Sequence, residues 1–171
     1  MGEKIEFWLN VFHYYIYKVD YKLHLLFNKI NPGFLLGKIP AVKKKFEEQG
    51  TTHLEVVNKI WTNKRFGFGI MISGGGIVII IFFIIWAIFL ILNSLLITPV
   101  NFSWQPFVIC MGLAYLICHF AVFQKDKFIL YFKRFEKWPK QEKWKHGLLS
   151  FSFIVGAIAL FIYSFRYLPL Q

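Results

Sequence analysis

The sequence predicts an all-α integral membrane protein with three transmembrane helices, preceded by an amphipathic helical region. Three observations lead to this class: an excess of apolar residues, three long runs without charge, and a one-sided placement of lysine and arginine. Hydrophobic residues make up 57% of the 171 residues, and the mean hydropathy is +0.51. Ordinary soluble domains hold about 45–50% apolar residues. A soluble fold of this length cannot bury the excess, so the bilayer is its natural solvent.

Three uncharged runs have the composition of membrane-spanning helices. A helix rises about 1.5 Å per residue, so about 20 apolar residues cross a hydrocarbon core of ~30 Å. The runs are residues 69–92, 106–123 and 147–165. With their flanks, they predict transmembrane helices at residues 67–98, 106–123 and 147–166, a short external loop at 99–105 and an external tail at 167–171.

Lysine and arginine lie on one side of these spans. Eleven of the 20 precede the first span and eight lie in residues 124–146, whereas residues 93–104 contain none. By the positive-inside rule, residues 1–66 and 124–146 are cytoplasmic and the C-terminus is external. The net charge of +11 therefore follows from topology and does not call for a nucleic-acid partner. The frequent Ile, Phe, Lys and Asn are typical of an AT-rich bacterial genome, so we expect a bacterial cytoplasmic (inner) membrane.

The N-terminal region has the periodicity of a helix but no run long enough to span. Apolar residues recur at i, i+3/i+4 and i+7 over residues 5–30, and Asn31-Pro32-Gly33 ends the pattern. Such a helix either lies in the bilayer interface or packs on a partner helix, and the pattern alone does not choose between them.

Two further helical segments flank the spans. Thr52-His-Leu-Glu55 is a capping box, and we expect the helix that it opens to run straight into the first span. Aromatic residues at helical spacing predict that the second span extends into the cytoplasm as far as Trp138-Pro139. The residues that we expect to dock a partner or the lipid interface are Trp8, Phe12, Tyr15, Val19, Leu26, Phe128, Phe132 and Phe135.

Small residues gather on all three spans. The glycines of the first span do not form a phosphate-binding loop, because a Walker motif requires Lys after its last Gly and Ile77 follows Gly76. In lipid, helices associate by close backbone approach at small residues. The alternative is a loosened or pore-lining helix segment. The residues that we expect to pack helices are Gly69, Ser73, Gly74, Gly75, Gly76, Cys110, Ala114, Cys118, Ser152 and Gly156.

The pattern of reactive residues offers no chemistry. The three runs contain no Asp, Glu, Lys or Arg, whereas proton relays and ion-coupled transporters nearly always carry one. We expect His119 to be structural and hydrogen-bonded, with Tyr115 one turn away. Cys110 and Cys118 lack the closely spaced Cys and His partners of a zinc site. We therefore expect no enzymatic activity, cofactor, metal or small-molecule substrate.

The leading hypothesis is a non-catalytic membrane subunit that scaffolds a larger complex of the cytoplasmic membrane. Its small-residue faces would dock other spans, and its aromatic amphipathic helices would dock cytoplasmic or membrane partners. The expected partners are membrane lipids and other membrane-protein subunits or copies of the chain itself. The competing hypothesis is a homo-oligomeric pore or membrane-perturbing effector, assembled through residues 69–76.

Overall fold

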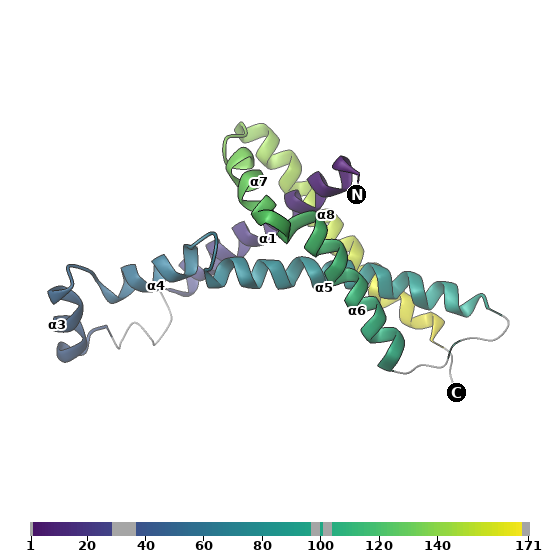
Figure 1. The fold of residues 1–171 in the computed structure, drawn as a ribbon, viewed down its shortest axis with the longest axis horizontal. Coiled ribbons are helices and arrows are strands. Elements are labelled where there is room, and N and C mark those ends of the chain that lie inside the picture. Colours follow the sequence, from purple (N-terminus) through teal and green to yellow (C-terminus); the bar gives the residue numbers. More distant parts are fainter. Residues whose placement is uncertain (1, 29–36, 97–99, 101–103, 169–171) are drawn as a thin grey trace. The chain divides into compact units, whose positions relative to one another are not determined.

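The computed structural model is a helical protein (Figure 1). It describes residues 2–28, 37–96, 100 and 104–168. The expected helix stop at Asn31-Pro32-Gly33 lies outside the described residues, as do parts of the loop at 99–105 and of the tail at 167–171. Every element in the described part of the chain is a helix, which confirms the all-α prediction.

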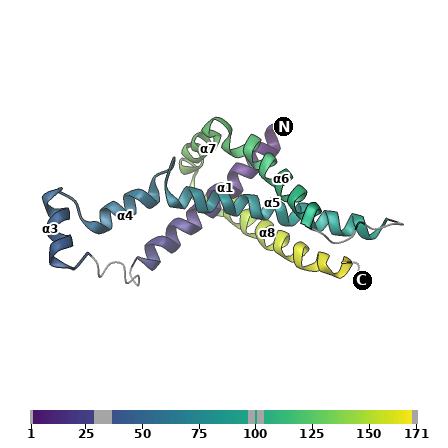
Figure 2. The same ribbon diagram turned by 60° about the horizontal axis from the view of Figure 1, so that its bottom comes forward.

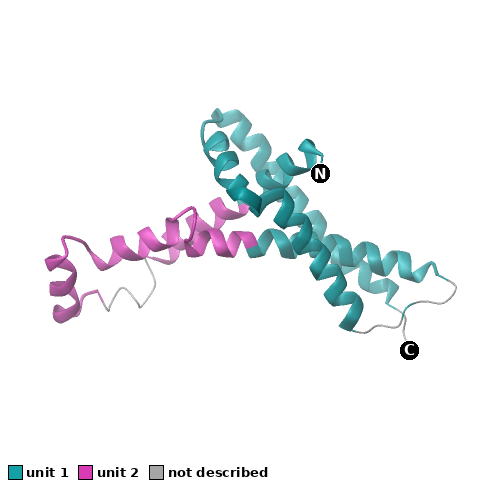
Figure 3. Cartoon of the chain, in the orientation of Figure 1, with its two compact units in different colours: residues 1–15, 75–171 teal, residues 16–74 magenta. Residues whose placement is uncertain are grey.

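The chain divides into two compact units (Figure 3). Residues 1–15 and 75–171 form unit 1, and residues 16–74 form unit 2. The division falls inside two helices, α1 (Glu3–Phe27) and α5 (Phe68–Ser94), so each of these helices contributes to both units.

Three helical stretches among the described residues are long and apolar enough to cross a membrane, as predicted. They are Phe68–Ser94, Trp104–Glu136 and Lys140–Tyr167. The first is α5, and the third joins α8 (Lys140–Ser164) to a short 3₁₀ turn, η3 (Phe165–Tyr167). By length and composition, the chain is an integral membrane protein.

Aromatic side chains hold the spanning helices of unit 1 together. The ring of Phe107 on α6 (Trp104–Cys118) lies edge-on to Phe82 of α5, with centroids 4.9 Å apart. Phe83 of α5 stacks on Phe161 of α8 at 4.2 Å. α5 therefore contacts both other spans, and the three helices can be followed in Figure 2. Ring pairs of this kind contribute about 0.5–1.5 kcal/mol beyond the area that they bury.

The helical stretch of the second span continues to Glu136, close to the predicted end at Trp138-Pro139, but it is kinked on the way. α6 widens into a π-helical turn, η1 (His119–Phe123), and then enters a 3₁₀ turn, η2 (Gln124–Asp126). Lys125 and Asp126 have positive φ angles of 58° and 53°, in the left-handed region. The helical path is broken there, and α7 (Lys127–Glu136) starts anew.

The helices of residues 40–62 begin at local signals in the sequence. α3 (Pro40–Glu48) has proline in its first turn, where the missing N–H costs nothing. α4 (His53–Thr62) opens with the predicted capping box, in which Thr52 and Glu55 bond each other's backbone N–H. The expectation that α4 runs straight into the first span is wrong, because Asn63 is extended (φ −61°, ψ 114°) and ends the helix before α5 begins.

The left-handed turn before α7 generates a prediction on stability. Replacing Lys125 by Gly should raise the free energy of unfolding by about 1 kcal/mol, because glycine adopts positive φ without the steric cost that lysine bears. The matched control is Lys133→Gly on the exposed side of α7, which should lower it by about 1 kcal/mol. Unfolding of the detergent-solubilised chain by SDS titration measures both. Equal losses in the two variants would contradict the left-handed turn.

Candidate functional site

The first half of α1 packs against the end of the second span in unit 1. Both hydrogens of the Asn10 amide are used: Nδ2 donates to the carbonyl of Glu6 at 2.8 Å and to that of Ala121 at 2.9 Å. The carbonyls in the last turn of a helix lack intrahelical partners. Asn10 therefore caps η1, and Lys127 does the same for Phe120, whose carbonyl accepts from Nζ at 3.2 Å.

His13 lies one turn further along α1 and is fully buried. Its ring contacts Phe123 of η1 and Phe128 and Phe132 of α7, with centroids 5.9, 5.6 and 5.1 Å away. Burial lowers the pKa of its imidazole from 6.5 to about 3. The ring is therefore neutral at physiological pH.

A charged contact fixes the start of α1 against α7. Lys127 Nζ donates to the Glu6 carboxylate at 2.7 Å, and the Tyr131 hydroxyl donates to it at 3.1 Å. The hydrogen bond from Lys127 is the largest of the effects that lower the pKa of the Glu6 carboxyl below its ordinary value. This carboxylate is therefore ionised and paired with Lys127 at neutral pH.

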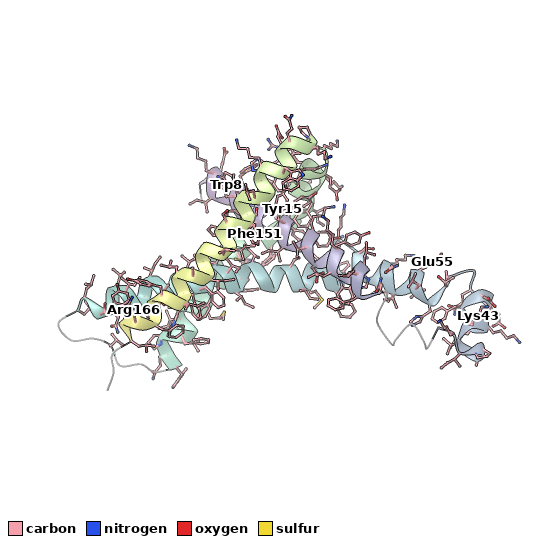
Figure 4. All side chains as sticks on the ribbon, turned by 180° about the vertical axis from the view of Figure 1, so that it is seen from behind. Trp8, Tyr15, Lys43, Glu55, Phe151 and Arg166 are labelled. Atoms are coloured by element: carbon pink, nitrogen blue, oxygen red, sulfur yellow. The ribbon has the colours of Figure 1, made fainter. Side chains whose placement is uncertain are left out.

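α1 also contacts the start of the third span. Tyr15, labelled in Figure 4, points toward α8, where its hydroxyl donates to the carbonyl of Lys143 at 2.5 Å. Gly147 gives the tyrosine room, because a Cβ there would lie 3.1 Å from the ring. Phe12 stacks on Phe153 with centroids 4.0 Å apart. Residues 6–15 of α1 thus pack on protein, which answers half of the question that the sequence left open.

The eight residues expected to dock partners fall into two groups. Phe12, Phe128, Phe132 and Phe135 are buried and Tyr15 is half-buried, all within this chain. The three phenylalanines of α7 pack within the chain, where Phe132 and Phe135 both contact Tyr14 of α1. Trp8, Val19 and Leu26 keep exposed surface, at 36%, 56% and 55%.

Most of the predicted helix-packing residues are covered by the chain itself. Cys110, Ala114 and Cys118 are buried on one side of α6. Gly69 is buried in unit 2, where a Cβ would lie 3.0 Å from Oδ2 of Asp20 and 3.1 Å from the carbonyl oxygen of Trp61. Ser73 and Gly74 are buried and Gly76 is half-buried.

Three of the predicted packing residues face outward. Gly75, Ser152 and Gly156 are exposed, and a Cβ added at Gly75 or Gly156 would meet nothing within 4 Å. Ser152 and Gly156 lie one turn apart on α8, of whose apolar stretch only 17% is buried. Another helix can therefore approach this face closely.

Unit 2 is held by a polar network between α1 and α4. Nε1 of Trp61 donates to the Asp20 carboxylate at 3.1 Å, and the Trp61 ring stacks on His24 at 4.2 Å. Nε2 of His24 lies 3.0 Å from Oδ1 of Asn58, which also accepts from Nδ2 of Asn28 at 2.7 Å. These side chains form a polar contact between the two helices.

The contacts of α1 reveal a pattern that our sequence analysis missed. The helix carries a polar stripe at i, i+3/i+4 and i+7 spacing, consisting of Asn10, His13, Tyr17, Asp20, His24 and Asn28. Four of its members are buried and the other two are half-buried. The same spacing rule that picked out the apolar residues would have found the polar stripe.

The described residues contain no group of three or more His, Cys, Asp or Glu side chains that could hold a metal ion. His119 is half-buried, and its ring stacks on Tyr115 with centroids 5.9 Å apart. An open apolar cavity of about 440 Å³ lies between Val78 of α5 and the α6 residues Phe107, Met111 and Tyr115. Its lining is suited to a hydrocarbon chain and presents no reactive group.

A comparison of the chain with protein-family models, with curated proteins and with solved structures found no match. Inferences about function therefore rest on the geometry of this chain alone.

The buried His13 predicts a pH dependence of stability. The unfolded chain binds a proton near pH 6.5, whereas the folded chain binds it only near pH 3, so stability falls as the pH drops below 6.5. The loss between pH 7.5 and 5.5 should be about 1.4 kcal/mol. His13→Leu should reduce this pH dependence by that amount, as measured by SDS titration at both pH values. An unchanged slope in the variant would mean that His13 is not buried as a neutral ring.

Gly147 of α8 is crowded by Tyr15, whereas Gly156 on the same helix has open space around it. The same substitution should therefore destabilise the chain at the first position and not at the second. Gly147→Val should destabilise the chain by about 1–3 kcal/mol, because the new side chain displaces Tyr15. The matched control is Gly156→Val on the same helix, where open space surrounds the new atoms. Unfolding in detergent measures both. Indistinguishable losses would show that Tyr15 does not pack against Gly147.

Proposed function

We propose that the chain is a non-catalytic integral membrane subunit that scaffolds a larger complex. The observation that supports this most directly is the open face of α8 at Ser152 and Gly156. Helices in lipid gain little from burying apolar surface and associate where small residues let their backbones approach. The chain covers most of the other predicted packing residues itself, so this face is suited to a helix of another subunit.

The proposed location is a bacterial cytoplasmic membrane, with the N-terminus inside and the C-terminus outside. The charge distribution supports this orientation, because residues 124–146 carry eight Lys and Arg and residues 93–104 carry none. The same orientation places Trp8 and Trp144, exposed at 36% and 72%, on the cytoplasmic side. Both indole rings are then available to soluble or membrane partners.

A homo-oligomeric pore is the second candidate. Gly75 on α5 and Gly112 on α6 are also exposed, with open space where a Cβ would lie. Uncharged helices with such faces line a pore once several copies form a ring. The scaffold is preferred because its docking face needs only one contacting helix.

Crosslinking in cells, followed by purification in mild detergent, tests the scaffold. The wild-type chain should retain other membrane proteins in a fixed ratio and gain stability when they are co-expressed. In the double variant Ser152→Leu/Gly156→Leu, the amount of co-purified partner should fall at least about tenfold, since bulky side chains prevent close approach of the helices. The matched control Phe151→Leu, also exposed on α8, should keep them.

The same preparation identifies the competing function. If the purified chain forms a uniform ring without other proteins and makes dye-loaded liposomes leak, it is a pore and the scaffold proposal fails. If no partner depends on Ser152 and Gly156, α8 is not the docking face.

A further inference from the structure

The second half of α1, in unit 2, has a polar inner side and an apolar outer side. Its inner side carries the polar network with α4, in which His24 is buried. Its outer side carries an apolar face of four residues with exposed fractions of 45–60%: Val19, Leu23, Leu26 and Phe27. In water, a helix buries its apolar stripe and exposes its polar one. The opposite arrangement indicates apolar surroundings for this apolar face.

Hydrogen bonding makes the arrangement specific. Trp61 bonds Asp20 and stacks on His24. Asn58 bonds both His24 and Asn28. Interhelical hydrogen bonds between polar side chains associate helices where the surroundings are apolar. The inner side of this pair is therefore complete, and the apolar face is left over.

The charge of unit 2 points to the chemistry of what covers the apolar face. Residues 16–74 carry ten Lys and Arg against four Asp and Glu. Lys22 is exposed between Val19 and Leu23 in the chain. Basic residues beside an apolar helix face are the pattern of a helix that lies in an anionic membrane surface, where each lysine contributes about 1 kcal/mol.

The second half of α1 lies close to a membrane-spanning helix in the same unit. The Asp20 carboxylate would lie 3.0 Å from a Cβ at Gly69, in the first turn of α5. Phe68 and Met71 on that turn are exposed, at 54% and 65%, and face lipid if α5 spans. At about 1.5 Å per residue, Leu23 and Leu26 follow Asp20 by roughly 5 and 9 Å along α1. The headgroup region, about 5–8 Å deep on each side of the core, is within their reach.

We propose that the apolar face of residues 19–27 is a lipid-docking surface, which inserts into the boundary between headgroups and acyl chains of an anionic leaflet. Leu23, Leu26 and Phe27 enter the acyl boundary, and Lys22 meets headgroup phosphates. The inference goes beyond the scaffold, because it needs no other protein and concerns a different unit from the face of α8.

Spin labels on the purified full-length chain in lipid nanodiscs test the docking. Single cysteines at Leu23 and Leu26, in a Cys110→Ala/Cys118→Ala background, carry the label on the apolar face. Glu48→Cys on the exposed surface of α3 serves as the aqueous reference, and Ile79→Cys on an exposed position of α5 as the hydrocarbon reference. Collision rates with oxygen, which enters lipid, and with a water-soluble nickel chelate measure immersion. Discs contain phosphatidylcholine with or without phosphatidylglycerol, and one or two copies of the chain.

The expected result is a nickel collision rate at Leu23 and Leu26 about threefold or more below that at Glu48 in one-copy discs with phosphatidylglycerol. Oxygen collision rates should approach those at Ile79. Nickel access equal to that at Glu48 at both positions would overturn the proposal. Protection that arises only in two-copy discs, with spin–spin broadening, would assign the apolar face to a second copy. Equal protection in pure phosphatidylcholine would overturn the role of anionic headgroups.

Discussion

The hydrogen bond from Asn10 to the carbonyl of Ala121 is the constraint on which the arrangement of unit 1 depends. It joins α1 to the end of a spanning helix at the turn where that helix widens and leaves carbonyls without intrahelical partners. With α1 held there, His13 meets the rings of α7 and Tyr15 meets the start of α8. An amide that satisfies a buried carbonyl avoids a desolvation cost of about 1–3 kcal/mol. The first half of α1 is therefore an integral part of unit 1.

The sequence was sufficient for the class of fold and for the spans, because uncharged runs of about 20 residues leave few alternatives. The capping box at Thr52 was equally predictable, since both of its hydrogen bonds are local. The break at Lys125 was not, because lysine is rare at positive φ. The break at Asn63 has a local signal that the prediction passed over, because Oδ1 of Asn63 accepts from the backbone N–H groups of Arg65 and Phe66, as asparagine does in turns.

The polar stripe on the buried side of α1 was missed in the sequence for a physical reason. Apolar residues indicate the inner side of a helix only when water is the solvent on its outer side. Polar residues such as His24 and Asp20 instead join helices through specific bonds where lipid is near. For a helix beside a membrane span, polar positions are thus as informative as apolar ones in predicting which side is buried. Phe132 and Cys118, which we expected to contact partners, are instead fully buried within the chain.

The distance in sequence between α1 and its partners has a consequence for biosynthesis. Asn10 bonds a residue 111 positions later and Tyr15 one 128 positions later. At roughly 5–20 residues per second, the ribosome needs on the order of ten seconds to supply those partners. During that interval α1 has been made, but the segments that satisfy Asn10 and Tyr15 have not. The N-terminal helix is thus among the first elements synthesised and among the last to reach its final contacts.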